Sequence, residues 1–257
     1  ERQASLIAHW MQLGFIHGVM NTDNTSVSGE TIDYGPCAFM DSYHPAKRFS
    51  SIDHQGRYAF ASQGPIAHWN LTRFAETLLP LLNDDTDQAV AEAESALDTF
   101  TGVHQTELER RFTAKIGIED GNADDGTLLE HLLAAMAEGA ADFTLVFRHL
   151  SDALDSGNDD NVTSLFDQPE AITAWLSRWR TRLHNVDRHQ AVALMRRMNP
   201  VFIPRNHRIE EVIQAGNNGD FAPFHRLNEM LQHPFAEQAV FAEYELAPAP
   251  DEVVHAT

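Results

Sequence analysis

The chain has 257 residues, of which 43% are hydrophobic, and this is enough for one large or two small domains with a substantial buried core. Its formal net charge of −20 argues against nucleic acid or an anionic membrane as a main partner, and no apolar run is long enough to cross a bilayer. The single cysteine, Cys37, excludes an intrachain disulfide and fits a reducing compartment, for which we expect the cytoplasm.

The first helix and the segment after it are predicted from the spacing of apolar and β-branched residues. Residues 1–16 place apolar side chains on one broad face, which indicates a helix that stops near Gly14. In residues 24–34, two short β-branched pieces flank a Ser-Gly-Glu turn, and this pattern predicts a small β-hairpin. Residues 35–65 are rich in Gly, Pro and aromatics without a sustained period, so we expect a long ordered loop.

Most of the remaining chain is predicted to be helical, which makes the fold class mainly α. Amphipathic patterns indicate helices at residues 66–82, 88–118, 126–139, 142–154, 169–185, 187–200, 208–220 and 221–234. The Pro-rich tail, residues 246–257, is expected to be loosely ordered. We therefore divide the chain into residues 1–62 with the hairpin and loops, a helical part at 63–245, and the tail.

Three polar residues near the start of the chain form a candidate site. Asp23 and Asn24 follow the first helix, and Asp33 lies at the far end of the predicted hairpin. Because paired strands lie about 5 Å apart, a hairpin would return Asp33 to the neighbourhood of Asn24. A carboxylate and an amide oxygen suit Mg²⁺, and Asp23 could then accept a proton from an incoming hydroxyl. The alternative is that these residues only form turns.

The same stretch can be compared with the protein-kinase pattern H-R-D-x-x-x-x-N followed by D-F-G. His17 and Asn24 fall at the offsets of the kinase His and Asn, and residues 33–35 read Asp-Tyr-Gly. Val19 occupies the position of the catalytic Asp, so Asp23 is the nearby acid that could replace it. Ordinary phosphoryl transfer and a pseudokinase scaffold without chemistry both stay open on this comparison.

A resemblance to a known family covers nearly the whole chain. Residues 14–41, GFIHGVMNTDNTSVSGETIDYGPCAFMD, resemble the signature of the selenoprotein O family, which are protein adenylyltransferases with a kinase-like fold. The resemblance continues through residues 53–60, 66–76 and 198–231. It implies a protein-kinase-like C-lobe with a small hairpin near its start and a family-specific helical C-terminal region.

The resemblance also implies an activity and a role for each candidate residue. The family transfers AMP from ATP to Ser, Thr or Tyr hydroxyls of protein substrates, with ATP flipped relative to its orientation in kinases. By resemblance, Asp23 is the proton acceptor, and Asn24 and Asp33 hold Mg²⁺, or Mn²⁺ in its place. Asp33 also lies against the ATP phosphates. Chemistry at a different phosphate explains why the kinase position is Val19.

The chain departs from the family pattern in one large respect. The family's N-terminal nucleotide-binding lobe, with its glycine-rich loop and cationic ATP ligands, has no counterpart here, and the chain opens without an initiator Met. We therefore expect the C-terminal half of an adenylyltransferase that begins inside a helix, that is inactive alone and that has the missing lobe as a partner.

Several further residues are weighed between chemistry and support. His17 could be a metal ligand or a base, but we expect it to organise the loop through backbone hydrogen bonds. Cys37 could be a nucleophile, although a small hydrophobe is the better default. The remaining interpretations are a bracing role for Asp53, His54 and Arg57, a capping or packing role for Arg205, and core positions for Trp69, Trp175 and Trp179.

Overall fold

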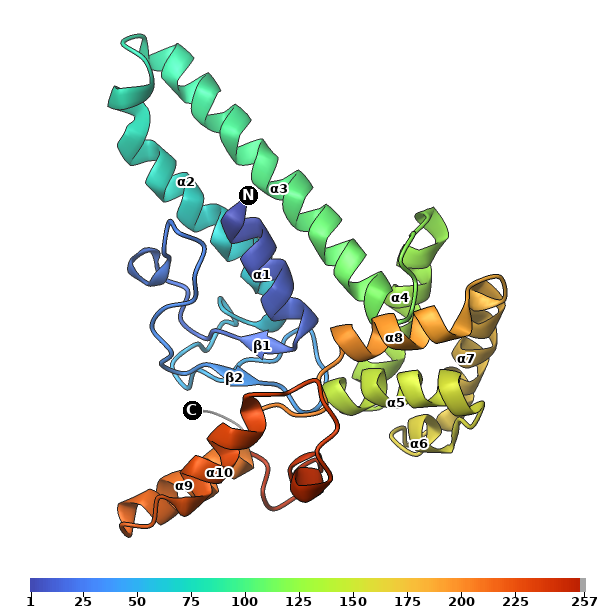
Figure 1. Ribbon diagram of the computed structural model, residues 1–257. Coiled ribbons are helices and arrows are strands. Elements are labelled where there is room, and N and C mark those ends of the chain that lie inside the picture. The colour runs from blue at the N-terminus through green and yellow to red at the C-terminus, as the bar shows by residue number, and fades with distance from the viewer. Residues whose placement is uncertain (255–257) are drawn as a thin grey trace. The chain divides into compact units, whose positions relative to one another are not determined.

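The computed structural model describes residues 1–254, which are mainly helical (Figure 1). These residues form two compact units, the first from Glu1–Cys37 and Pro45–Arg111, the second from Ala38–His44 and Phe112 onward. The functional division predicted at residues 62 and 245 is a different one and stays a prediction. No helix in the described part of the chain has the length and apolar character that a membrane span requires.

The first unit consists of three helices and the long loops between them. Its elements are α1 (Arg2–Gln12), β1 (Phe15–Ile16), the 3₁₀ turns η1 (Thr22–Asn24) and η2 (Phe60–Ser62), α2 (Gln63–Leu82) and most of α3 (Thr86–Lys115). A short turn joins α2 to α3, and the two run antiparallel as a helical hairpin (Figure 1). At the base of this pair, a Cβ on Gly64 would lie 2.8 Å from the His104 ring, so a larger residue there would require that ring to shift.

The second unit is a helical assembly with a tryptophan pair in its core. Trp175 and Trp179 are buried, stack with ring centroids 5.6 Å apart, and donate their indole N–H groups to the carbonyls of Leu128 and Ile116. The elements of this unit are β2 (Ala38–Phe39), α4 (Ala123–Glu138), α5 (Phe143–Ser156), α6 (Asp160–Thr163), α7 (Pro169–Leu183), α8 (Arg188–Met198), α9 (Asn206–Asn217), α10 (Ala222–Leu231) and η3 (Ala239–Tyr244).

The helix predictions are confirmed, and three other predictions need correction. Every predicted helix is present, although the first ends at Gln12 because Gly14 takes a left-handed φ of 72° and the chain becomes extended. The predicted hairpin at 24–34 is wrong, since no strand lies in that segment. Trp69 is 41% exposed, whereas Trp175 and Trp179 are in the core as predicted. Cys37 is only half-buried.

The segment at 24–34 forms no hairpin because α1 and α2 satisfy its polar groups. Gln3 donates to the carbonyl of Ser26, Trp10 donates to the Thr31 hydroxyl at 2.9 Å, and Asn70 donates to the Thr25 hydroxyl at 3.0 Å. These hydrogen bonds to the two helices replace the ladder that a hairpin would form with itself. The tail, residues 246–254, has no helix or strand, and residues 255–257 lie outside the described residues.

Arg205 is the centre of a buried ion cluster in the second unit. Its side chain is 1% exposed, and its guanidinium donates to Asp41, to Asp142 at 2.7 Å and to the carbonyl of Glu245 at 3.1 Å. Asp142 also caps α5 by accepting from the Leu145 N–H. Arg205 therefore joins the segment that contains Asp41 to the starts of α5 and α9. Of the two predicted roles for Arg205, packing is the correct one.

We expect Arg205→Met to lower the free energy of unfolding by about 3–5 kcal/mol, because the buried Asp142 and the half-buried Asp41 lose their cation. Burial raises the pKa of Asp41, and Arg205 opposes that rise. Removing the cation raises this pKa further, so the folded variant binds protons more readily than its unfolded chain. The loss should therefore shrink as pH falls. Urea unfolding at pH 8 and pH 5 measures it. Arg197→Met, on an exposed part of α8, is the control, and equal losses for both variants would contradict the assignment.

Candidate active site

The three candidate residues all lie at the surface of the first unit. Asp23 and Asn24 are on η1, and Asp33 is in the loop that follows. Asp23 and Asp33 are exposed, and within the described chain neither carboxylate has a hydrogen bond or an ion pair. Both therefore present free acceptor oxygens to solvent.

The side-chain amide of Asn24 is held through its nitrogen. Its Nδ2 donates to the carbonyl of Val19 at 3.0 Å, and its Oδ1 accepts no hydrogen bond from the described residues. The anchored nitrogen fixes which end of the amide remains available, and that end is the oxygen. The Asn24 oxygen is thus the free end of the amide, and its role as a metal ligand stays a prediction.

His17 connects the two segments that contain Asn24 and Asp33. The imidazole is fully buried, its Nε2 lies 2.8 Å from the carbonyl of Ile32, and the N–H of Val19 donates to its Nδ1 at 3.4 Å. A proton on Nε2 satisfies both hydrogen bonds. Because Val19 also holds Asn24, one side chain organises both flanks of the site, and the predicted loop-organising role of His17 is confirmed.

The backbone of the site uses two unusual conformations. Gly18 has a φ of +83°, and a Cβ there would lie 2.5 Å from the carbonyl oxygen of Pro36, so only glycine fits. Asp33 has a φ of +56°, which aspartate tolerates better than most residues, and its carbonyl accepts from the Gly35 N–H at 2.9 Å. The close approach at Gly18 is a second link between the two flanks.

Helix α2 supports the candidate site through two buried side-chain amides, those of Gln63 and Asn70. Gln63 accepts from the N–H of His17 at 3.1 Å and donates to the carbonyl of Phe15 at 3.0 Å. Asn70, seven residues later on the same helix, donates to the carbonyl of Met20 at 2.9 Å and to Thr25, on either side of η1. Sequence reasoning missed both residues, although two polar residues on the buried face of an amphipathic helix are a signal that could have found them.

The long loop before α2 is held by internal hydrogen bonds, as predicted. The three residues that were expected to brace it, Asp53, His54 and Arg57, contribute in different ways. Asp53 is buried and accepts from the N–H groups of Arg57 and Tyr58 at 2.8 and 2.9 Å, so its bracing role is confirmed. Tyr58 donates from its hydroxyl to Asn21, the residue that precedes η1. The Arg57 side chain stacks on Trp69 instead, and His54 is exposed.

The donor set suits Mg²⁺ better than other metals. Among the described residues, no three His, Cys, Asp or Glu side chains form a metal-binding group. Mg²⁺ does not require such a group, since it often takes one or two protein oxygens and fills its other positions with water and phosphate. Asp33 and Asn24 Oδ1 have oxygens of that kind, and their joint role as Mg²⁺ ligands stays a prediction. Burial raises the pKa of the Cys37 thiol, which opposes a role as thiolate nucleophile.

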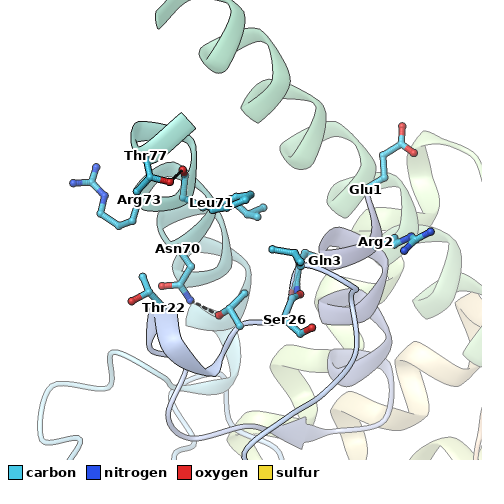
Figure 2. Close-up of a pocket in the computed structure, with 12 residues that line it drawn as sticks. Glu1, Arg2, Gln3, Thr22, Ser26, Asn70, Leu71, Arg73 and Thr77 are labelled. Carbon is cyan, nitrogen blue, oxygen red and sulfur yellow. Dashed lines mark hydrogen bonds between the residues drawn. The ribbon is translucent and has the colours of Figure 1, made fainter. Parts of the chain in front are cut away.

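A pocket of about 650 Å³ adjoins this site without containing it (Figure 2). It is bounded by the start of α1, the residues around η1 and the middle of α2, and Thr22 and Asn70 are part of its wall. Asp23, Asn24 and Asp33 are not among its lining residues. The three candidate residues therefore lie outside this pocket.

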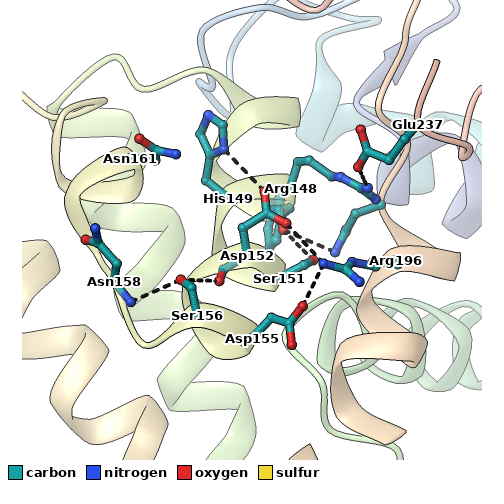
Figure 3. Close-up of polar contacts among 12 residues, drawn as sticks. Arg148, His149, Ser151, Asp152, Asp155, Ser156, Asn158, Asn161, Arg196 and Glu237 are labelled. Carbon is teal, nitrogen blue, oxygen red and sulfur yellow. Dashed lines mark hydrogen bonds and ion pairs between the residues drawn. The ribbon is translucent and has the colours of Figure 1, made fainter. Parts of the chain in front are cut away.

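The second unit contains a charged cluster that we assign to packing (Figure 3). Arg148 is buried and pairs with Glu237, while Arg196 reaches Asp152 at 3.5 Å and Asp155 at 3.0 Å. Each cation of this cluster already has a carboxylate partner. The cluster therefore offers no free charge for a ligand.

Comparison with known proteins identifies relatives over almost the full chain. The model of the family described as protein adenylyltransferase SelO matches residues 1–232. The chain is 56% identical over 260 residues to protein nucleotidyltransferase YdiU of a Bradyrhizobium species, which covers 98% of this chain and 52% of that protein. The corresponding protein of Nitrobacter hamburgensis is 51% identical, with 99% and 51% covered. The chain thus spans about half the length of the curated relatives it matches.

We expect His17→Ala to loosen the site while the helices persist, because the buried imidazole makes two of the hydrogen bonds that hold the site's flanks. Each lost hydrogen bond is worth about 1 kcal/mol, so local opening should become about five- to thirtyfold more frequent. Amide hydrogen exchange over residues 17–35 measures this opening. His54→Ala, at an exposed position, is the control, and unchanged exchange in His17→Ala would contradict the role.

Proposed function

The chain belongs to the protein adenylyltransferase SelO family, and on that premise we propose that it contributes the proton acceptor and metal ligands for ATP-dependent transfer of AMP to protein hydroxyls. One observation carries the proposal: three oxygen-bearing side chains with free acceptor atoms lie on segments that a buried histidine and a buried helix face hold. Surface turns with no ligand would not need such support.

Asp23 is the proton acceptor of the proposed reaction. A general base must reach the hydroxyl of its substrate, and the Asp23 carboxylate is exposed with no competing partner in the described chain. The hydroxyl oxygen of the Ser, Thr or Tyr forms a bond to the α-phosphorus of ATP, and the bond to pyrophosphate breaks. The proton of the hydroxyl passes to the Asp23 carboxylate, and pyrophosphate leaves with the electron pair of the broken bond.

Asn24 and Asp33 are the proposed ligands of Mg²⁺, or of Mn²⁺ in its place. Asp33 supplies a charged oxygen, and Asn24 supplies a neutral one whose orientation is set by its bond to Val19. The ion, when bound, neutralises charge on the phosphates and so makes the phosphorus a better electrophile. Asp33 would also lie against the ATP phosphates in this proposal.

We assign the fold of the first unit and its helical continuation to a protein-kinase-like C-lobe. The order of a helix, a His17 loop, an Asn24 turn and an Asp-Tyr-Gly loop supports this assignment. Since the chain spans about half of its relatives, the other half of such proteins would supply the nucleotide-binding lobe. We accordingly propose that this chain alone turns over no ATP, that its site acts in the cytoplasm, and that it completes its active site with that lobe.

Transfer of the γ-phosphate, as in kinases, is the weaker alternative. It would place the base at position 19, and Val19 contributes only its backbone groups to the site. A scaffold without catalytic activity is a still weaker alternative than a kinase, because it gives no reason for three side chains with free acceptor oxygens on segments that His17 and α2 hold in place.

The decisive test uses the full-length protein with Mg²⁺ and ATP labelled at either the α- or the γ-phosphate. We expect label from the α-phosphate on protein, with loss of transfer in Asp33→Ala and a decrease of about 10²–10⁴-fold in Asp23→Asn. Label from the γ-phosphate alone would establish a kinase, and the argument from Val19 would be wrong. No label from either position would favour the scaffold.

A second test separates the metal role of Asn24 from its structural role. Asn24→Ala should raise the Mg²⁺ concentration for half-maximal transfer at least about tenfold, since a ligand is lost. Asn24→Asp keeps an oxygen ligand and should retain most of the Mg²⁺ affinity. Equal Mg²⁺ requirements in Asn24→Ala and the unmodified protein would remove Asn24 from the ligand set.

A further inference from the structure

An exposed aromatic and cationic surface lies beside the candidate site. It consists of Arg57, Trp69 and Arg73, which we call the Arg–Trp surface. The two guanidiniums lie 4.7 and 5.3 Å from the centre of the Trp69 ring, which is 41% exposed. A large part of this indole thus stays open to solvent, where an aromatic side chain can contact a partner.

The Arg–Trp surface is linked directly to the segment that contains Asp23. Arg57 also lies over the ring of Tyr58 at 5.8 Å, and the Tyr58 hydroxyl donates to Asn21 at the start of η1. On α2, Trp69 is followed by Asn70, whose amide donates to the carbonyl of Met20 just before η1. Two independent connections therefore join this surface to the turn on which the proposed proton acceptor lies.

Arg57 has a charge that the described chain leaves unpaired. It forms no ion pair with a described carboxylate, whereas Arg73 pairs with Glu76 at 2.7 Å. Residues 45–58 contain three cations and a single acid, Asp53, whose oxygens accept backbone N–H groups. On a chain with a net charge of −20, this stretch of the sequence has more cations than acids.

A stacked guanidinium is suited to a carboxylate. Its face contacts the aromatic ring, its N–H edge stays free for a bidentate pair, and the stacking limits the rotamers that binding must fix. The remaining acidic surface repels acidic chains, so this region would accept an acidic segment only at the Arg–Trp surface.

We propose that the Arg–Trp surface docks an acidic segment of the protein substrate next to its target hydroxyl, with Arg57 as the main determinant of this preference. The inference rests on the proposed transfer of AMP to protein hydroxyls. It adds a substrate class to that function: hydroxyl residues flanked by Asp or Glu.

The test compares three peptides that share one serine and differ only in Glu, Gln or Lys at the flanking positions. AMP transfer by the full-length protein is measured as kcat/KM at saturating ATP. We expect the Glu peptide to exceed the Gln peptide about fivefold or more, mainly through KM. Arg57→Gln should bring the ratio near one, and Arg57→Glu should favour the Lys peptide.

Two controls separate charge from structure. Arg57→Lys keeps the cation and should retain much of the preference for Glu, although the bidentate pair is lost. Arg197→Gln removes one positive charge from exposed α8 in the second unit and should leave the ratio as it is. A ratio that changes equally in Arg197→Gln would mean a net-charge effect and would overturn the proposal.

The outcomes distinguish this inference from the function beneath it. If α-label is transferred but the ratio is the same in all Arg57 variants, the docking proposal fails and the transferase proposal stands. If no α-label reaches any protein, the transferase proposal fails, and fluorescence anisotropy of the labelled peptides still tests docking. A labelled single-stranded oligonucleotide that binds through Arg57 when the Glu peptide does not would also overturn the proposal.

Discussion

The candidate site depends on one buried imidazole. His17 accepts from the N–H of Val19 and donates to the carbonyl of Ile32, and so it fixes two segments between which residues 20–31 form only the short turn η1. Neither segment has a strand or helix long enough to hold itself. A buried donor and acceptor on a rigid ring supply what regular secondary structure would otherwise provide, because each unmade bond would leave a backbone group unsatisfied away from water.

Helix α2 is the second support, and it acts through amides rather than through apolar packing alone. Gln63 bonds the backbone at Phe15 and His17, and Asn70 bonds it at Met20, so one face of this helix follows the loop from its start to η1. Side-chain amides suit this task because each has both a donor and an acceptor. Trp69 precedes Asn70 in the sequence. It is exposed to solvent and gives the same helix a surface beside the site.

The helices could be predicted from sequence because their apolar period is long and regular. The structure of residues 24–34 could not be predicted correctly, because their short β-branched pieces match a strand pattern. The hydrogen bonds that compete with a hairpin come from Gln3 and Asn70, which are distant in sequence. Trp69 was misplaced in the core for a related reason. Helical periodicity gives the face of a residue but not whether another element covers that face, and here arginine side chains cover part of it.

The roles of Asp23, Asn24 and Asp33 stay predictions from the sequence motif, and the hairpin that was expected to bring their segments together is absent. Two other devices link the flanks: the His17 imidazole and the close approach of Gly18 to Pro36. A single sequence gives no sign of either link, since both join backbone groups. The way in which two segments are linked can thus differ from what the local sequence pattern predicts.

Val19 shows why the site can do without an acid at that position. Its N–H bonds His17 and its carbonyl bonds Asn24, so its contribution passes entirely through the main chain, and any residue with the same backbone conformation could make both bonds. The residue at position 19 therefore supports the site through its backbone groups. In the reaction that we propose, the proton acceptor is another residue with a free carboxylate, and Asp23 fits that proposal because it is exposed and has no partner among the described residues.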